Sequence, residues 1–378
     1  MWRTALESNR DVSVTVDVNA GDKHYHVLIA PGLLTESGAA IAKTLSPGRC
    51  AIISDSNIAL LFAERIQKSL TTAGFDPALI TVPAGEQSKT LGEAERICDR
   101  MLEAGLDRHS FVVGLGGGVI GDLSGFVASI FQRGIPHVQI PTTLLAMVDS
   151  SIGGKTGVNT KLAKNMVGSI HHPSLVIDDL EVLKTLPPRE FTQGFAEIIK
   201  HAVIADEKMF HYLTKIADSE LDRFKRSSFP DDFGGLVRRN IEIKARFVAT
   251  DELDRKGDRA LLNFGHTVAH GIERAGGYRE ILHGEAVSLG IVAAASISVK
   301  RAGLSSEQRD SIVALLKRFG LPTRLPKNLS REQILEALKF DKKFERGEIR
   351  FVLTPRIGTA QLSRDVTMED IREGVNAL

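Results

Sequence analysis

The chain has 378 residues, which is long for a single hydrophobic core and predicts two domains. Its 43% apolar and 25% charged residues are those of an ordinary globular protein, and a formal net charge of +1 argues against nucleic-acid and membrane partners. The only cysteines, Cys50 and Cys98, exclude a disulfide framework and a cysteine-based zinc site, and they fit a reducing cytoplasm.

The first half of the chain alternates short apolar runs with helical patterns. Residues 11–30 alternate apolar and polar side chains and predict a hairpin. This alternation of strands and helices predicts a parallel sheet with helices on both faces, whose strand ends should carry ligands. The expected strands are 50–55, 79–86, 110–118 and 137–143, and the expected helices are 58–74 and 91–105.

After Pro188 the periodicity becomes mostly helical. We expect a mainly α-helical second domain, so the α/β domain spans 1–185 and the helical domain 186–378. The charged segment 219–235 is expected to be a loop or a frayed helix end. The expected helices are 195–204, 236–249, 265–275, 284–303, 306–320 and 331–340, and strands are expected only within 349–363.

A glycine motif, "GLGGGVIGD" (114–122), follows an expected strand and opens a helix. Gly116, Gly118 and Gly121 match G-x-G-x-x-G, which lets backbone N–H groups approach a pyrophosphate at a helix N-terminus. The acidic residue expected about 20 residues later is missing, so this is not a standard dinucleotide motif. A plain strand-to-helix turn is the alternative. Polar strand ends at "PAGEQSKT" and "PTT" favour the nucleotide site.

The segment "DSSIGGKT" (149–156) ends like a phosphate-binding P-loop. Asp149 stands where the motif requires its first glycine, which excludes a Walker A site. Lys155, Lys161 and Lys164 lie among glycines beside Asn165, a composition that suits an anion-binding loop. A solvated loop with surface lysines is the alternative.

Two further segments carry candidate metal ligands. Glu197 and Lys200 lie in an otherwise apolar helix, where a charge requires a buried partner, either a metal or an opposite charge. His266 and His270 are four residues apart and share a helix face, and His283 follows. Two histidines and a carboxylate are the usual ligands of a catalytic zinc. The alternative is a buried core histidine at 270 and a helix cap at 283.

Long stretches of the chain resemble 3-dehydroquinate synthase, in the order of that family and from Asp55 to about Ile357. The stretches are "GGGVIGDLSGF", "RGIPHVQIPTTLLAMVDSSIGGKTGVN", "KNMVGSIHHP", "LKTLPPREF", "GFAEIIKH", "LLNFGHTVAHGIE" and "LHGEAVSLG". The resemblance implies a Rossmann-like NAD domain, a mainly helical metal domain, and usually a homodimer.

The resemblance also implies roles for individual residues. Glu197, His266 and His283 match the ligands of a divalent metal, usually zinc and sometimes cobalt. Arg133 matches a phosphate-binding arginine that reaches the neighbouring subunit's site. Positions matching NAD contacts are Asp55, Glu86, Lys89, Gly116, Gly117, Gly118, Asp122, Thr142, Thr143, Asp149, Lys155, Lys164, Lys184 and Thr185. Positions matching substrate and catalytic residues are Asp149, Lys155, Asn165, Lys200, Arg259, Asn263, His270 and Lys343.

The activity implied is that of a phosphate-eliminating lyase of the shikimate pathway, which leads to chorismate and the aromatic amino acids. It converts 3-deoxy-D-arabino-heptulosonate 7-phosphate (DAHP) to 3-dehydroquinate and phosphate, and NAD⁺ is consumed and regenerated within one turnover. His270 is the best candidate for proton transfer, since imidazole titrates near neutral pH. Alternatives are a related cyclase (amino-dehydroquinate, 2-deoxy-scyllo-inosose or valiolone synthase), a metal-dependent polyol dehydrogenase, and a non-catalytic NAD- or metal-binding protein.

Overall fold

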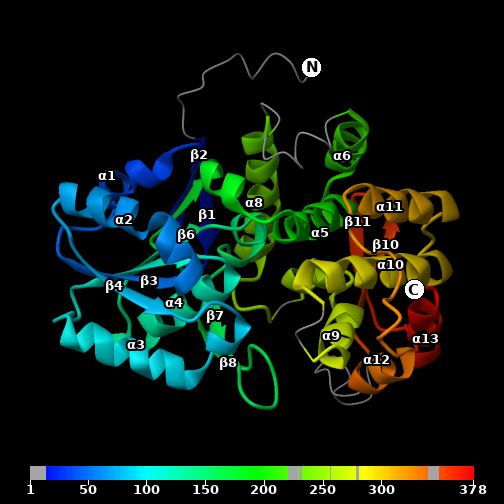
Figure 1. The fold of residues 1–378 in the computed structure, drawn as a ribbon. Helices are drawn as coiled ribbons and strands as arrows, with labels where there is room; N and C mark the ends of the chain where they lie inside the picture. Colours follow the sequence, from blue (N-terminus) through cyan, green and yellow to red (C-terminus); the bar gives the residue numbers. More distant parts are fainter. Residues whose placement is uncertain (1–13, 220–228, 230–231, 256, 278–280, 339–348) are drawn as a thin grey trace. The chain divides into compact units, whose positions relative to one another are not determined.

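The computed structural model describes residues 14–219, 229, 232–255, 257–277, 281–338 and 349–378. They form two compact units (Figure 1). The first unit comprises Met1–Leu186 and Asp231–Ala245, and the second comprises Pro187–Pro230 and Arg246–Leu378. The main division lies one residue beyond the expected 185/186 boundary.

Residues 231–245 belong to the first unit, although the sequence placed all residues after 185 in the second domain. Helix α8 (Phe233–Thr250) begins inside segment 219–235, which we expected to be a loop or a frayed end. Its first part belongs to the first unit, where the Lys244 ammonium pairs with the Asp149 carboxylate at 2.7 Å. This contact joins the helix to a residue far away in the sequence.

The first unit is built on a seven-stranded sheet of order β1-β2-β9-β6-β5-β3-β4. The edge hairpin β1–β2 is antiparallel, and all the other pairings are parallel. The expected hairpin and parallel sheet are therefore present. The strands are β1 (Val14–Ala20), β2 (Lys23–Ala30), β3 (Arg49–Asp55), β4 (Asp76–Val82), β5 (Phe111–Gly116), β6 (His137–Pro141) and β9 (Leu175–Asp179).

Helices cover both faces of this sheet because the central strands are apolar on both sides. In β3, Ala51 and Ile53 face a core shared with α3 and α4, and every residue of β5 is buried. Helix α2 packs on β3 and β4, and Asp55 caps it by accepting hydrogen bonds from Asn57 N and Ile58 N. The helices are α1 (Ser37–Ala42), α2 (Ser56–Thr72), α3 (Leu91–Glu103) and α4 (Gly118–Ile130).

The sheet has a topological switch point between β3 and β5. From β3 the chain moves outward to β4 and then returns to the other side of β3 as β5. Ligands of open α/β sheets bind outside the carboxyl ends of the strands at such a point. Asp55 ends β3 and Gly116 ends β5, so both lie where a ligand is expected.

The lysine-rich segment that resembled an anion-binding loop forms a small antiparallel hairpin. Its strands are β7 (Lys155–Val158) and β8 (Val167–Ile170), with Lys155 paired to Ile170. The connection between them carries Lys161, Lys164 and Asn165. The glycines of "GGKTGVN" therefore belong partly to a strand.

The second unit is mainly helical, as expected. Helix α10 lies at its centre and packs on α5, α9, α11, α13 and β10. Pro188 starts α5, and Ser305 and Thr367 cap α11 and α13. The elements are α5 (Pro188–Ala205), α6 (Glu207–Ser219), α9 (His266–Ala275), α10 (His283–Arg301), α11 (Ser306–Arg318), α12 (Arg331–Leu338), α13 (Met368–Asn376), β10 (Phe351–Arg356) and β11 (Thr359–Ser363).

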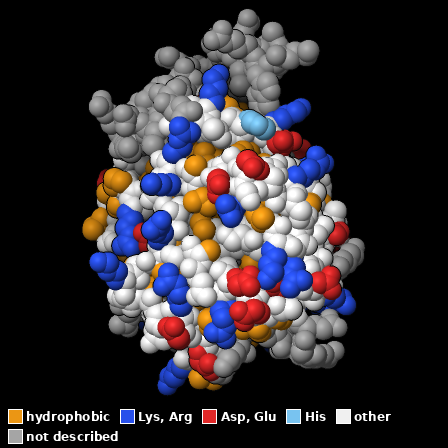
Figure 2. All heavy atoms as spheres, turned by 90° about the vertical axis from the view of Figure 1, so that its right-hand side faces the viewer, with side chains coloured by type: hydrophobic (Ala, Val, Ile, Leu, Met, Phe, Trp, Pro, Cys, Tyr) orange, Lys and Arg blue, Asp and Glu red, His pale blue; other side chains and the backbone are white. Residues whose placement is uncertain are grey.

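The outer side of this unit that carries α11 and α13 has charges of both signs interspersed with scattered hydrophobic side chains (Figure 2). Lys300 pairs with Glu373 at 2.8 Å, and Arg309 pairs with Asp310 at 2.8 Å. The described part of this face resembles an ordinary solvated surface. Among the described helices, none has the length and apolar character that a bilayer crossing requires.

Candidate active site

A fully buried carboxylate, Glu197, forms the centre of the candidate metal site. It lies on α5, whose residues 193–204 are all buried. Lys200, one turn further along and 1% exposed, forms an ion pair with it. A carboxylate in such apolar surroundings requires opposite charge, as the sequence predicted.

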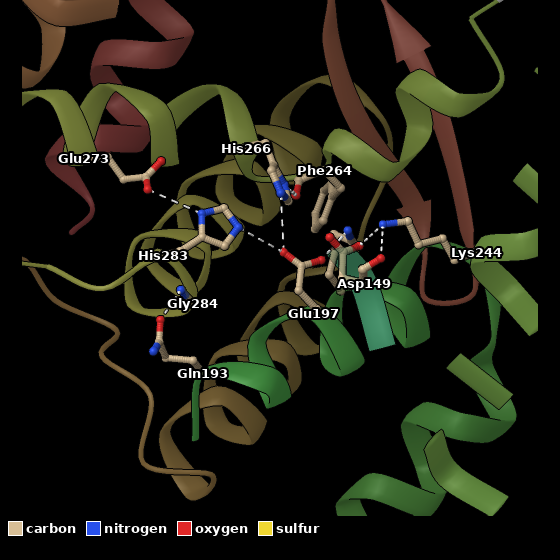
Figure 3. A network of polar contacts seen from close by, with 10 residues as sticks. Asp149, Gln193, Glu197, Lys244, Phe264, His266, Glu273, His283 and Gly284 are labelled. Carbon is tan, nitrogen blue, oxygen red and sulfur yellow. Dashed lines mark hydrogen bonds and ion pairs between the residues drawn. The ribbon is translucent and has the colours of Figure 1, made fainter. Parts of the chain in front are cut away.

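Two imidazoles from different helices converge on the same oxygen of Glu197 (Figure 3). Nε2 of His266, the first residue of α9, lies 3.4 Å from Oε1. Nε2 of His283, the first residue of α10, lies 3.6 Å from it. The three residues offer ligand atoms that all lie within 4.8 Å of one another. The structure therefore brings the three predicted metal ligands together.

The second ring nitrogen of each histidine faces an acceptor. Nδ1 of His266 lies 3.3 Å from the carbonyl oxygen of Phe264, and Nδ1 of His283 lies 3.4 Å from a carboxylate oxygen of Glu273 (Figure 3). Outer partners of this kind hold the proton on Nδ1 and leave the lone pair of Nε2 for a metal. Sequence reasoning missed Glu273. The sequence did offer a signal, since Glu273 falls within the helix expected at 265–275. In the structure this glutamate is 7% exposed.

Glycines bring the helices close enough for this geometry. A Cβ on Gly284 would lie 2.5 Å from the backbone oxygen of Gln193 on α5, so α10 can begin against α5 only with glycine at this position. The Gln193 side chain also accepts a hydrogen bond of 3.1 Å from Gly284 N. Gly265, with φ of +80°, turns the chain into α9 just before His266, where a Cβ would lie 2.7 Å from Ile291 N.

The electrostatics of the cluster fit a cation. Burial opposes ionisation of Glu197, but Lys200, then His266 and His283, hold its pKa well below the usual value. Burial lowers the pKa of His266 to about 4, and Glu197 only partly opposes this. Burial also disfavours the charge on His283, but its interactions with the Glu197 and Glu273 carboxylates raise its pKa to about 10.

The oxygens of Glu197 also lack hydrogen bonds. Both are buried, and neither has a hydrogen bond of acceptable geometry with a described residue, although cationic nitrogens lie within ion-pair distance. Two imidazoles and a carboxylate with unsatisfied oxygens are a donor set that fits Zn²⁺ or Co²⁺.

Other predicted residues of the second unit lie on the same elements. Arg259 is buried, and its guanidinium donates to the carbonyl oxygen of Glu252 at 2.8 Å. Arg259 and Asn263 belong to a short 3-10 helix that directly precedes His266. The His270 ring centroid lies 5.8 Å from that of His266, and the His270 side chain is exposed. Lys343 lies outside the described residues.

In the first unit, the predicted NAD residues gather at the carboxyl edge of the sheet. Gly116, Gly117 and Gly118 join β5 to α4, which has no side-chain cap at its N-terminus. Thr142 follows β6, and its buried hydroxyl has no hydrogen-bond partner among the described residues. An uncapped helix start beside an unsatisfied hydroxyl fits a bound pyrophosphate.

Two groups of predicted residues meet at this edge. Lys89 is buried and contacts Asp122 and the side-chain oxygen of Asn165. Burial raises the pKa of Asp122, and Lys89 opposes that rise. Glu86 accepts a hydrogen bond of 2.7 Å from Asn159 and lies 3.8 Å from the Lys164 ammonium. Asn165, assigned to substrate, and Lys89, assigned to NAD, are thus in direct contact.

The remaining predicted residues of this unit are dispersed. Lys184 and Thr185 end a 3-10 helix after β9, and their side chains contact Glu181 and the carbonyl oxygen of Val182. Arg133 is exposed in a left-handed conformation with φ of +70°. Lys155 is exposed and begins β7. Thr143 follows the end of β6, and Asp55 is the last residue of β3.

Sequence reasoning also missed Lys244. Its ammonium donates to the Asp149 carbonyl oxygen at 2.6 Å and pairs with the Asp149 carboxylate. Lys244 is 7% exposed and follows Val237 and Ile241 on the buried face of α8. A lysine on the apolar stripe of an expected helix was the signal that could have revealed it.

This fold and these residues define a class of protein, a two-unit enzyme whose α/β unit has a strand edge that fits a nucleotide and whose helical unit has a donor set that fits a metal. Sequence comparison is more specific. The family models of the 3-dehydroquinate synthase N-terminal and C-terminal regions match residues 79–193 and 194–344. The chain belongs to the 3-dehydroquinate synthase family, which confirms the resemblance.

Individual relatives agree with this assignment. The 3-dehydroquinate synthases of Symbiobacterium thermophilum and Thermodesulfovibrio yellowstonii are 44% and 42% identical to the chain, each over 95% of it and over 99% and 98% of those proteins. A solved 2-epi-5-epi-valiolone synthase of Streptomyces hygroscopicus, with NAD⁺ and Zn²⁺ bound, has a TM-score of 0.84 at 28% identity, covering 95% of this chain and 97% of that one.

A more distant likeness concerns the fold alone. A probable glycerol dehydrogenase of Sinorhizobium meliloti has a TM-score of 0.61 at 17% identity, covering 92% of this chain and 94% of that one. Proteins of different families thus share the two-unit architecture, so the fold alone does not identify the reaction. The residues of the site must identify it.

Proposed function

We propose that the chain converts DAHP to 3-dehydroquinate and phosphate, with NAD⁺ regenerated in each turnover and a divalent metal bound by Glu197, His266 and His283. The observation that carries the proposal is the convergence of both imidazoles on one oxygen of a fully buried glutamate, at 3.4 and 3.6 Å, in a member of this family.

The cofactors divide the chemistry between them. When bound, NAD⁺ accepts and returns a hydride, and the metal polarises substrate oxygens as a Lewis acid. The protein's own residues bind and orient the substrate and move protons. Lys200 compensates the charge of Glu197 inside the apolar helix, which keeps the carboxylate ionised.

We propose further that a proton is transferred by His270 and that the anionic groups of the substrate are held by Lys155, Asn165, Arg133 and Lys343. Cationic and amide donors suit phosphate and carboxylate groups. The exposure of His270 and Lys155 supports these roles, because a group that meets substrate must be reachable from solvent. A cytoplasmic homodimer is part of the same proposal.

One assay tests the proposed function. DAHP is incubated with the protein, NAD⁺ and zinc, and phosphate, 3-dehydroquinate and NADH absorbance are followed together. We expect phosphate and 3-dehydroquinate in equal amounts and no accumulation of NADH. Steady accumulation of NADH without phosphate would identify a polyol dehydrogenase instead.

A related sugar phosphate cyclase is the second candidate, favoured by the likeness to the solved valiolone synthase. Such an enzyme would also recycle NAD⁺, so NADH alone does not separate the two. The discriminating measurement is phosphate release from DAHP compared with release from other sugar phosphates at equal concentration. We expect DAHP to have the highest kcat/KM.

A further inference from the structure

A second group of potential metal ligands lies on the edge hairpin of the first unit, away from the strand ends that carry the predicted NAD residues. Asp17 is on β1, and His24 and His26 are on β2. The strand register pairs Asp17 directly with His26 and pairs Asn19 with His24. The group is built entirely within one two-stranded ribbon.

One carboxylate oxygen of Asp17 lies between the two imidazoles. Oδ1 is 2.7 Å from Nδ1 of His26 and 3.4 Å from Nε2 of His24. The two rings are 4.8 Å apart and nearly perpendicular, at 88°. All three ligand atoms lie within 4.8 Å of one another, as they do in the buried cluster at Glu197.

Strand geometry fixes this arrangement. Side chains alternate between the faces of a strand, so His24 and His26 point to one side and Tyr25 between them to the other. Tyr25 is 2% exposed, and its hydroxyl accepts a hydrogen bond of 3.1 Å from Gly153 N. Val16 and Val18 flank Asp17 and are also buried, which holds the register and the outward direction of all three ligands.

We propose that Asp17, His24 and His26 form a second, exposed binding site for a divalent transition-metal ion such as Zn²⁺ or Ni²⁺. Two imidazole nitrogens and a carboxylate oxygen are the donors these ions prefer, and exposure leaves further coordination positions open to water. The cation takes the place of the proton shared by His26 and Asp17. The cation binds the lone pair of Nδ1, and the single proton of the neutral His26 ring is then held on Nε2.

The exposed site binds less tightly than the buried cluster. The side chains of Asp17, His24 and His26 are 63%, 49% and 46% exposed, whereas Glu197 is completely buried. Water therefore solvates the exposed ligands, and a cation gains less on binding them than it does at a buried carboxylate. The two sites are thus separable by affinity, and this proposal does not rest on the proposed function.

The test starts from the holoenzyme with one zinc per chain, freed of loose metal by gel filtration. Ni²⁺ is titrated by calorimetry and equilibrium dialysis, and retained zinc is measured in the same samples. We expect one further equivalent of Ni²⁺ per chain in the wild type. The double variant His24→Asn, His26→Asn should lose that equivalent while keeping its zinc and its activity, because both side chains are exposed.

A matched control is His211→Asn, since His211 is an exposed histidine on α6 outside the group. It should bind Ni²⁺ like the wild type. Asp17→Asn should weaken Ni²⁺ binding. If this variant binds Ni²⁺ with the affinity of the wild type, the carboxylate is not a ligand and the three-ligand proposal is overturned. No further equivalent in the wild type, or undiminished uptake in the double variant, would also overturn it.

Discussion

Among single residues, the histidines of "HTVAH" (266–270) show what spacing does and does not decide. Four residues apart on α9, His266 and His270 lie on one side, with ring centroids 5.8 Å apart. Only His266 points a nitrogen at Glu197, and the His270 side chain is exposed. The pair therefore divides between a proposed metal ligand, His266, and a group open to solvent, His270.

This division predicts that substitutions of the proposed metal ligands and of His270 will affect zinc content and kcat differently. Glu197→Ala or His283→Ala should lose bound zinc and activity together, because each removes one of three ligands. His270→Ala should keep its zinc and lose at least about 100-fold in kcat, the usual contribution of a general acid or base. Zinc content and kcat are measured on the same preparations. Full zinc in either ligand variant, or loss of zinc from His270→Ala, would contradict the assignment.

We propose that Glu273 acts through His283 as a positioning residue. Its carboxylate lies 3.4 Å from Nδ1 of His283 and helps to raise the pKa of that imidazole to about 10. Glu273→Gln should weaken zinc binding about 10–100-fold, the usual effect of losing an outer partner of a histidine ligand. Chelator competition measures the zinc affinity.

The matched control for Glu273 is Glu285→Gln. Glu285 lies in the first turn of α10, two residues from His283, but pairs with Arg189 at 2.7 Å instead of the imidazole. This variant should change thermal stability more than zinc affinity. Equal zinc affinity in Glu273→Gln and the wild type would refute the positioning role.

At the scale of elements, the first turn of α10 decides where His283 lies. Gly284 permits the close approach to α5, and the Gln193 side chain accepts from its N–H. The position of a metal ligand thus depends on the contact between two helices.

Gly284→Ala tests this contact. The new methyl group would have to displace α10 from the Gln193 backbone, so we expect a stability loss of about 1–3 kcal/mol and weaker zinc binding. Gly92→Ala on α3 is the control, because a Cβ there meets no atom within 4 Å. It should be neutral or stabilising by up to about 1 kcal/mol. Similar behaviour of the two variants in urea unfolding and zinc titration would contradict the prediction.

Helix α13 carries a pH-dependent contribution to stability. Burial disfavours the charged form of Asp370, but hydrogen bonds from Thr367, Arg301 and Lys300 lower its pKa below the ordinary 3.8. Because the folded pKa is depressed, the stabilisation is present above pH 3.8 and is lost as pH falls through the folded pKa.

Asp370→Asn should therefore cost about 1–3 kcal/mol near neutral pH, the contribution expected of a charged hydrogen bond. The difference from the wild type should shrink as pH falls below 3.8. Urea unfolding across a pH series measures it. Glu369→Gln, at an exposed neighbouring position, should have little effect. A difference that stays constant with pH would show that Asp370 stabilises by packing alone.

For the whole molecule, a net charge of +1 is compatible with an anionic substrate because several lysines belong to the segments that the resemblance assigns to ligand binding. Lys89 and Lys164 belong to contact networks at the carboxyl edge of the first unit, and Lys155 begins the hairpin beside them. A balanced composition gives no indication of a polyanionic partner, and it leaves open a site for a small anion.

The proposed homodimer makes a prediction about subunit mixing. If Arg133 serves the neighbouring subunit's site, Arg133→Ala and Glu197→Ala are each inactive alone but complement each other. After unfolding and refolding as an equal mixture, about a quarter of the sites should be active, since half the dimers are mixed and each has one complete site. Each variant refolded alone is the control and should show no activity. If the mixture contains mixed dimers but shows no activity, Arg133 serves the site of its own subunit.

Much of the fold followed from the sequence because its signals are local. Apolar alternation and helical periodicity located the strands and helices at most positions, and the glycine motif identified the ligand edge after β5. Expected boundaries were less accurate. The strand expected at 79–86 runs from Asp76 to Val82, since Pro83 ends it. The resemblance supplied the identities of the metal ligands.

The sequence by itself thus determined the types of element and the family, and it nominated the residues proposed to carry the chemistry, because periodicity and motifs lie within short windows. Tertiary structure alone decided that Nε2 of both His266 and His283 converges on Glu197, that Glu273 supports one of them, and that Lys244 pairs with Asp149. These contacts join residues far apart in the chain. Their geometry depends on how closely helices pack, which no local pattern specifies.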